Sequence, residues 1–205
     1  MPVDDDAQPL LDVPDGVVTL LVAKVPLEMA VFPEMAVMAL ARGGPLAAGP
    51  YVKDLLMRTS DYIWRDGDDC PYQIAPAVRS LLKGMGANVA ACTRDRKPEV
   101  RIKALVALRG MGGQMLPHAA DVAQLLSDED STVRAAAAYA LGSVGGRAGR
   151  WAAELAALLS DGDPAVRYAA AFTLGGAGRK AAPHLRGLSA LLGDEDFRCR
   201  LPAVR

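Results

Sequence analysis

The segment Pro98-Glu99-Val100-Arg101 returns twice along the chain, as Ser131-Thr132-Val133-Arg134 and as Pro164-Ala165-Val166-Arg167. The interval is 33 residues each time, and Phe197-Arg198-Cys199-Arg200 opens a fourth copy. Other columns keep the same interval without gaps: Leu108/Leu141/Leu174, Gly112/Gly145/Gly178 and Asp128/Asp161/Asp194. A fixed period of this length indicates a repeat array, in which each unit buries its apolar face against its neighbours.

Each repeat is predicted to contain two helices. In the third copy the first helix begins after Asp163, since an aspartate caps a helix by accepting hydrogen bonds from the N–H groups of the first turn. It ends at Gly178, because glycine readily adopts the left-handed conformation that closes a helix. The second helix starts near Pro183 and runs to the pair Leu191-Leu192. The predicted fold class is therefore all-α, an α-α superhelix of stacked helix pairs.

The stretch Ser160–Gly178, S-D-G-D-P-A-V-R-Y-A-A-A-F-T-L-G-G-A-G, resembles the short HEAT-like repeats that also occur in phycobilin lyases. The resemblance covers about residues 94–205 and implies a HEAT-like solenoid with the Val-Arg helices on its concave side. It also implies a hydrogen-bonded ladder between successive repeats. The side chains that fit this ladder are Asp130, Asp163 and Asp196 with Arg134, Arg167 and Arg200.

The chain divides into three predicted parts. Residues 1–16 are predicted to be a flexible acidic tail, and residues 17–93 are predicted to hold degenerate helical repeats with a polar loop at 59–73. The regular 33-residue repeats occupy 94–205. Within the second part, Ile74–Lys83 resembles the outer helix of an earlier repeat, joined to the regular repeats by a longer loop.

Composition and charge predict a cytoplasmic protein that does not bind nucleic acid. Residues 1–93 carry 7 basic and 12 acidic side chains, and residues 94–205 carry 16 and 12, which is too small an excess for a nucleic-acid footprint. The three cysteines are widely spaced without a C-x-x-C motif, which argues against a disulfide framework or a zinc site. Charges and prolines interrupt the apolar stretch 17–40, so no membrane span is predicted.

The Val-Arg helices carry apolar side chains on the side opposite their core face. At about 100° per residue, Ile102 and Val106 fall opposite the core positions of the first such helix. Their equivalents in later copies include Tyr139, Tyr168 and Phe172. Since a surface helix ordinarily carries polar groups there, these five residues are the predicted partner-binding site, an apolar groove. The alternative is that the N-terminal segment or tight curvature covers them.

The polar stretch Asp61–Tyr72 holds the only candidates for catalysis, Asp66 and Asp68. Its spacing lacks the calcium-loop pattern with a closing glutamate. The sequence contains none of the common motifs for a catalytic serine, a zinc protease or a phosphate-binding loop. No metal and no cofactor are predicted, and the sequence favours a protein without enzyme activity.

The favoured function is a protein-interaction scaffold or adaptor that binds a partner segment in the apolar groove. The alternative is a lyase- or isomerase-like enzyme that holds a small apolar ligand in the same groove. A HEAT-like DNA glycosylase is disfavoured, because it needs a basic concave face and the pI is about 6.1. At the C-terminal end, Leu191, Leu192 and Phe197 need cover, which predicts a homodimer or a segment folded back.

Overall fold

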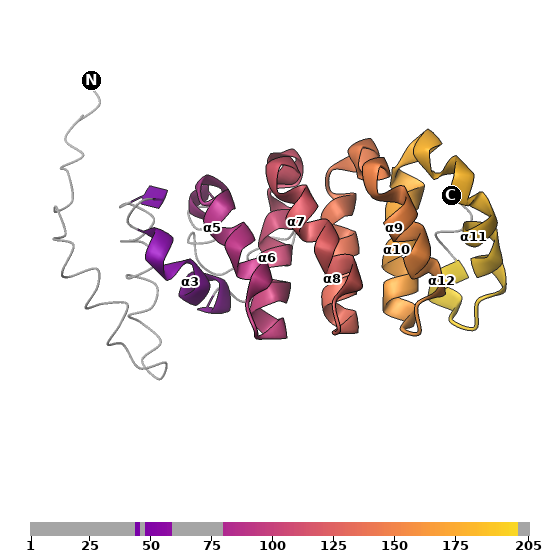
Figure 1. Ribbon diagram of the computed structural model, residues 1–205, viewed down its shortest axis with the longest axis horizontal. Helices are drawn as coiled ribbons and strands as arrows, with labels where there is room; N and C mark the ends of the chain where they lie inside the picture. Colours follow the sequence, from indigo (N-terminus) through magenta and orange to yellow (C-terminus); the bar gives the residue numbers. More distant parts are fainter. Residues whose placement is uncertain (1–43, 46–47, 59–79, 201–205) are drawn as a thin grey trace, which may run out of the picture.

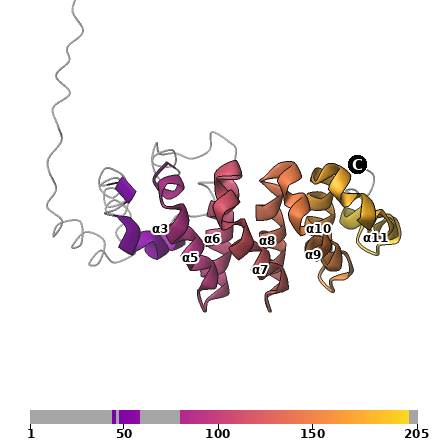
Figure 2. The same cartoon turned by 45° about the horizontal axis from the view of Figure 1, so that its top comes forward.

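A computed structural model describes residues 44–45, 48–58 and 80–200 of the chain. Within these residues the structure consists of helices and connecting turns, without a strand. The helices stack side by side in one elongated array, and Figures 1 and 2 show two layers along its length. The predicted all-α superhelix is confirmed. The predicted tail at 1–16 lies outside the described residues.

The first layer is formed by the Val-Arg helices α6 (Pro98–Gly110), α8 (Ser131–Gly142) and α10 (Pro164–Gly176), with α12 (Phe197–Arg200) opening the fourth repeat. In the second layer, each repeat has a 3-10 segment followed by a short α-helix. These pairs are η4 (Gly112–His118) with α7 (Ala119–Gln124), η6 (Gly145–Trp151) with α9 (Ala152–Ala157), and η8 (Gly178–His184) with α11 (Leu185–Ala190). The repeats close with the 3-10 turns η5 (Leu125–Ser127), η7 (Leu158–Ser160) and η9 (Leu191–Gly193).

Helical structure also precedes the regular repeats. It includes η1 (Gly49–Tyr51), α3 (Val52–Arg58), α5 (Gly86–Ala91) and η3 (Cys92–Arg94), and residues 80–84 are helical as well. Because α5 and η3 lie 33 residues before α7 and η5, they form the second layer of an earlier repeat. The prediction of a longer loop there is wrong. Gly84 and Gly86 are poor helix formers, but the buried Leu82, Met85 and Val89 hold this segment against the core.

The caps fix the ends of the first-layer helices. Asp130 accepts hydrogen bonds from two N–H groups of the first turn of α8, at 2.8 and 3.2 Å, and Asp163 accepts one from Ala165 at 2.8 Å in α10. After α8, Gly145 has a φ of 59°, in the left-handed region, and its equivalents in the flanking repeats have φ values of 56° and 61°. The predicted aspartate caps and glycine turns are confirmed, so the chain reverses direction in the same way in all three repeats.

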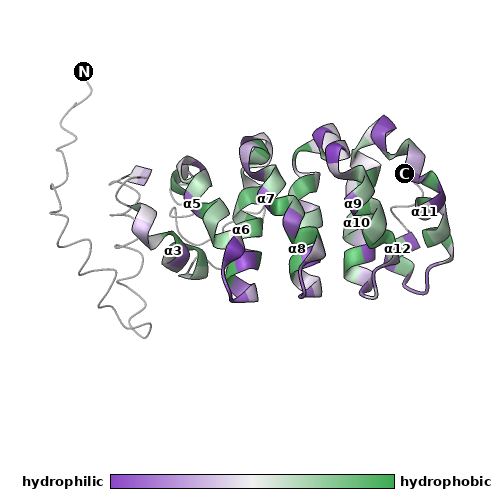
Figure 3. Cartoon of the chain, in the orientation of Figure 1, coloured by the Kyte–Doolittle hydropathy of each residue, from purple (hydrophilic) through white to green (hydrophobic). Residues whose placement is uncertain are grey.

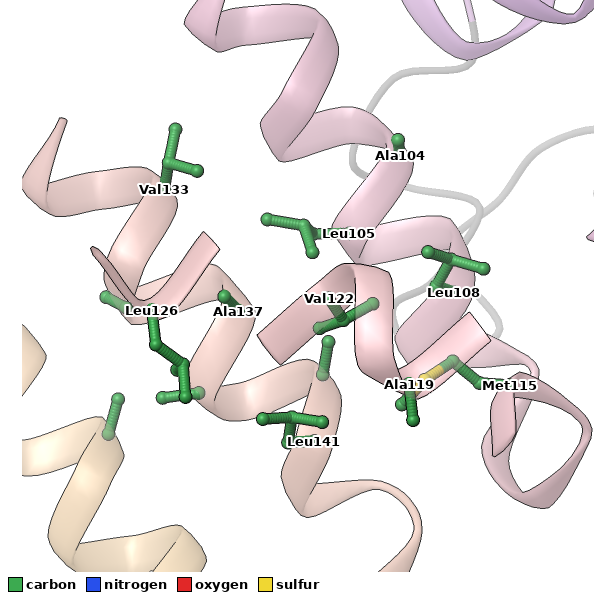
Figure 4. Close-up of a cluster of buried hydrophobic side chains, with 14 of the residues drawn as sticks. Ala104, Leu105, Leu108, Met115, Ala119, Val122, Leu126, Val133, Ala137 and Leu141 are labelled. Carbon is green, nitrogen blue, oxygen red and sulfur yellow. The ribbon is translucent and has the colours of Figure 1, made fainter. Parts of the chain in front are cut away.

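Apolar side chains from both layers fill the space between them (Figure 4). Leu105 and Leu108 of α6, Val122 of α7 and Leu141 of α8 are fully buried, as is Met115 of η4. Burying one such side chain contributes about 1.5–3 kcal/mol. Because the cluster draws on two successive repeats, neither repeat could bury its apolar face alone.

Alanine brings the first-layer helices close together. Of the described elements, α8 and α10 make the most extensive contact, and Ala137, Ala138 and Ala170 are fully buried there. Across this contact Thr173 Oγ1 donates a 2.9 Å hydrogen bond to the carbonyl of Ala138. Consecutive second-layer helices contact each other less. The first layer is therefore the more tightly packed of the two.

Candidate functional site

Arginines of the Val-Arg motifs join successive repeats through ion pairs. Arg134 donates to both carboxylate oxygens of Asp161, at 2.8 and 2.9 Å. In the same way Arg167 donates to both oxygens of Asp194, each at 2.8 Å. A bidentate pair fixes orientation as well as separation. These ion pairs, which we call the Arg–Asp ladder, therefore hold neighbouring repeats in one fixed relation.

The ladder extends toward the N-terminus. Arg101 donates a 2.8 Å hydrogen bond to Asp128, and Lys53 donates a 2.6 Å bond to Asp95, which stands 33 residues before Asp128. Each arginine also binds the loop before its own helix, as Arg101 does by donating to the carbonyls of residues 95 and 96 at 3.0 and 3.1 Å. One side chain thus fastens both the loop of its own repeat and the loop of the next.

The prediction that Asp130, Asp163 and Asp196 are the acidic partners in the ladder is wrong. Asp130, Asp163 and Asp196 do not pair with these arginines, because their carboxylates accept hydrogen bonds from the N–H groups at the helix starts. The ladder instead uses the column Asp128/Asp161/Asp194. The backbone there is extended after each closing 3-10 turn, which points the carboxylate toward the preceding repeat. Asp163 keeps one contact between repeats, a 2.5 Å hydrogen bond from Ser131 Oγ.

These hydrogen bonds lower carboxyl pKa values. Bonds from Arg167 and from the N–H of Asp196 hold the pKa of Asp194 below its ordinary value. Bonds from the Arg198 guanidinium and N–H lower the pKa of Asp196 to about 2. A carboxyl with a lower pKa in the folded state stabilises the fold above its ordinary pKa of about 3.9. This stabilisation is lost as the pH falls from about 5 toward 2.

We therefore expect the urea midpoint of unfolding to hold steady from about pH 7 to 5 and to fall progressively below about pH 5. Far-UV circular dichroism in urea series at each pH measures it. The Asp194→Asn variant should start from a lower midpoint and lose less of it on acidification, since one of the shifted carboxyls is gone. A midpoint that stays constant down to about pH 3 would contradict the role given to these carboxylates.

All five predicted partner-binding residues lie on first-layer helices and keep exposed surface. We call them the apolar stripe: Ile102 and Val106 on α6, Tyr139 on α8, and Tyr168 and Phe172 on α10. Phe172 is 45% exposed, and the other four are half-buried. Ile102 and Tyr139 also pack against the core. At the position on α8 equivalent to Ile102, Ala135 is buried.

Three aromatic rings of the stripe contact one another across two repeats. The centroid of the Tyr139 ring lies 6.3 Å from that of Tyr168 and 6.2 Å from that of Phe172, and the Tyr168 and Phe172 rings stack at 6.3 Å. The guanidinium of Arg109, from α6, lies over the Tyr139 ring at 5.3 Å from its centroid, a cation–π distance. Burial, with a smaller contribution from Tyr168, raises the pKa of Tyr139, so its phenol stays neutral.

The other predicted site residues divide by location. Asp66 and Asp68 lie outside the described residues, and the catalytic role predicted for them stays a prediction. At the C-terminal end, Leu192 is 50% and Phe197 63% exposed, as expected for a surface that needs cover. Leu191, by contrast, is buried within its own repeat, so its inclusion in that surface is wrong. The homodimer stays a prediction.

Two further findings concern the described residues alone. No helix among them is long and apolar enough to cross a membrane, and no group of histidine, cysteine and acidic side chains there is arranged to hold a metal ion. Cys92 and Cys199 are buried free thiols.

Sequence reasoning missed two features near the stripe. One is the contact of Arg109 with Tyr139, because its two members come from different repeats. The other is a set of basic side chains in the turns that follow α8 and α10: Arg147, Arg150, Arg179 and Lys180. The sequence did carry a signal for these basic side chains, because residues 131–153 and 164–193 contain no aspartate or glutamate that could balance them.

Known proteins show the same architecture. The family model for HEAT repeats matches residues 87–150, and the chain is a HEAT-like repeat protein. A designed armadillo repeat protein in complex with the peptide (KR)4 is 15% identical, with 93% of this chain and 96% of that chain covered and a TM-score of 0.56. An engineered protein is 18% identical, with 91% and 95% covered and a TM-score of 0.57.

Kap121p is 15% identical and has a TM-score of 0.59, with 93% of this chain and 25% of that chain covered. At such identities the likeness shows the fold alone. No curated protein matches the sequence.

Proposed function

We propose that this chain is a cytoplasmic protein-interaction scaffold that binds a segment of a partner protein along the apolar stripe. The observation that carries the proposal is the contacting set of Tyr139, Tyr168 and Phe172 on one layer of the array, with Phe172 45% exposed. Large aromatic side chains dominate the binding energy of many interfaces. A set of three that keeps exposed surface suits a partner's apolar side chains.

Rigidity supports the same proposal. The three rings come from α8 and α10, which the Thr173 hydrogen bond and the close packing of alanines hold together. The Arg–Asp ladder fixes the repeats from the loop side. A surface held in place before binding loses little conformational entropy when a partner binds.

The tighter packing of the first layer supports placing the stripe on the inner side of a curved array, because helices on the inner side lie closer together. Similar solved structures include the designed armadillo protein in complex with (KR)4 and Kap121p bound to Pho4p. They support a binding role for a solenoid of this architecture. An extended peptide or an amphipathic helix would suit the apolar stripe.

Truncation of the stripe should weaken binding much more than stability. For Phe172→Ala and Tyr168→Ala we expect the free energy of unfolding to fall by about 1 kcal/mol or less, since the main loss is the ring–ring contact. Proteins retained from a lysate of the source cells by the immobilised wild-type chain should be lost from both variants. Urea denaturation and quantitative mass spectrometry of the retained proteins provide the two readouts.

The matched control is Leu185→Ala, which truncates a 60% exposed side chain on α11, in the second layer. It should leave both stability and the retained proteins unchanged. If Phe172→Ala instead cost about 3–5 kcal/mol, as truncation of a buried phenylalanine does, and the retained proteins stayed the same, the stripe would be part of the core. The proposed function would then be wrong.

A further inference from the structure

The turns after α8 and α10 carry exposed basic side chains that we call the basic edge: Arg147 and Arg150 in η6, and Arg179 and Lys180 in η8. In Figure 3 these turns are hydrophilic and lie at the top of the view. The two turns contact each other, and a Cβ at Gly149 would lie 2.6 Å from the Cβ of Lys180. Glycine thus lets η6 and η8 pack closely, so the four cations share one edge of the array.

Ion pairs within the described residues do not account for these four charges. None of the four forms an ion pair with another described residue, whereas Arg134 and Arg167 each have an aspartate partner. Close to the edge in sequence, the only carboxylate is that of Glu154 in α9. Clustered like charges without a counter-charge suit an anionic ligand.

At the opposite edge of the first layer, the loops before α8 and α12 are acidic. They carry Glu129 and Glu195, whose side chains are each 86% exposed, whereas the loop before α6 carries the exposed cations Arg96 and Lys97. Along α10 the order is acidic loop, then Tyr168 and Phe172, then the basic turn η8. Tyr168 and Phe172 therefore lie between an acidic loop and the basic edge, and the cation of Arg109 lies over Tyr139 beside them.

We infer that the partner segment is acidic as well as apolar: its apolar side chains pack on the stripe and its carboxylates contact the basic edge. This inference rests on the proposed function and specifies the chemistry of the partner. A peptide is narrow enough to contact the stripe and one edge while avoiding Glu129 and Glu195. A nucleic acid has a high density of phosphates, which Glu129 and Glu195 would repel.

The test is selection of peptides from a displayed random library on the immobilised full chain. Enriched peptides should combine aspartate or glutamate with leucine, phenylalanine or tryptophan. For the tightest synthetic peptide, fluorescence anisotropy should show binding about tenfold weaker with the double variant Arg147→Glu/Arg179→Glu at low salt. The difference should shrink as salt rises, because surface charges are screened.

The matched control is Lys83→Glu/Arg96→Glu, the same charge change at exposed cations away from the basic edge. Its expected effect on the affinity for the peptide is under about twofold.

The outcomes separate this inference from the proposed function. If the enriched peptides need Phe172 but carry no excess of acidic residues and ignore the edge variant, this inference is wrong and the proposed function stands. If no enriched peptide depends on Phe172 or Tyr168, both are wrong. If a single-stranded oligonucleotide binds more tightly than every enriched peptide and loses affinity with the edge variant, the ligand is a nucleic acid and the inference is overturned.

Discussion

Replacement of Arg167 by methionine is expected to lower the free energy of unfolding by about 3 kcal/mol. Methionine keeps the apolar stem but removes both hydrogen bonds to Asp194 and the bonds to the carbonyls of Asp161 and Gly162. The side chains of Arg167 and Asp194 are only 9% and 7% exposed, so the remaining carboxylate would lose its partner in a nearly dry position. Urea denaturation at neutral pH measures the loss.

An exposed ion pair nearby provides the control. Arg198 pairs with Asp196 at 2.6 Å, but its side chain is 58% exposed. Water and salt weaken such a pair, so Arg198→Met should change the free energy of unfolding far less than Arg167→Met. Equal effects of the two substitutions would show that the ladder does not stabilise the array more than an ordinary surface pair.

Truncation of Leu141 to alanine should cost about 3 kcal/mol or more. The side chain is fully buried between α6, α7 and α8, where the cluster of Figure 4 joins two repeats. Its removal leaves a cavity as well as less buried apolar surface. Because stability in such arrays is a sum over repeats and their interfaces, the variant should also unfold less cooperatively, with hydrogen exchange becoming faster near α8 before the ends.

The same chemical change at Leu192, which is 50% exposed, is the control and should cost about 0.5 kcal/mol or less. If Leu141→Ala were as mild as Leu192→Ala, the two repeats would not share the core described above.

The fold of the regular repeats could be predicted because each structural role recurs at one interval. The left-handed glycine after α8 and the cap at Asp130 have their counterparts in the next repeat, and a coincidental match would not reproduce both at the same interval. The earlier repeat was harder, since Gly84 and Gly86 weaken the local helical signal. There the buried Leu82 and Val89 outweigh propensity, which a local pattern cannot reveal.

The ladder shows where periodicity stops being informative. The columns that contain Asp128 and Asp130 have the same period, so spacing alone could not assign one to the ion pairs and the other to the caps. Only the fold decides between them: Asp130 stands at the N-cap of α8 and accepts from N–H groups of its first turn, whereas Asp128 accepts from Arg101. For the site, helical phase was enough to select the residues of the apolar stripe. Phase could not reveal that Arg109 reaches over a ring on the neighbouring helix.

The Arg–Asp ladder also bears on how such a gene can change in length. Each rung that begins at an arginine joins residues 27 positions apart, and the caps recur every 33 residues. Excision of residues 131–163 would remove one arginine and one aspartate that pair only with each other, and would leave Asp130 directly before Pro164, where Asp163 stands now. The flanking rungs, Arg101–Asp128 and Arg167–Asp194, would be untouched. A whole cassette can thus be duplicated or lost in one recombination event without leaving an orphaned charge in the interior.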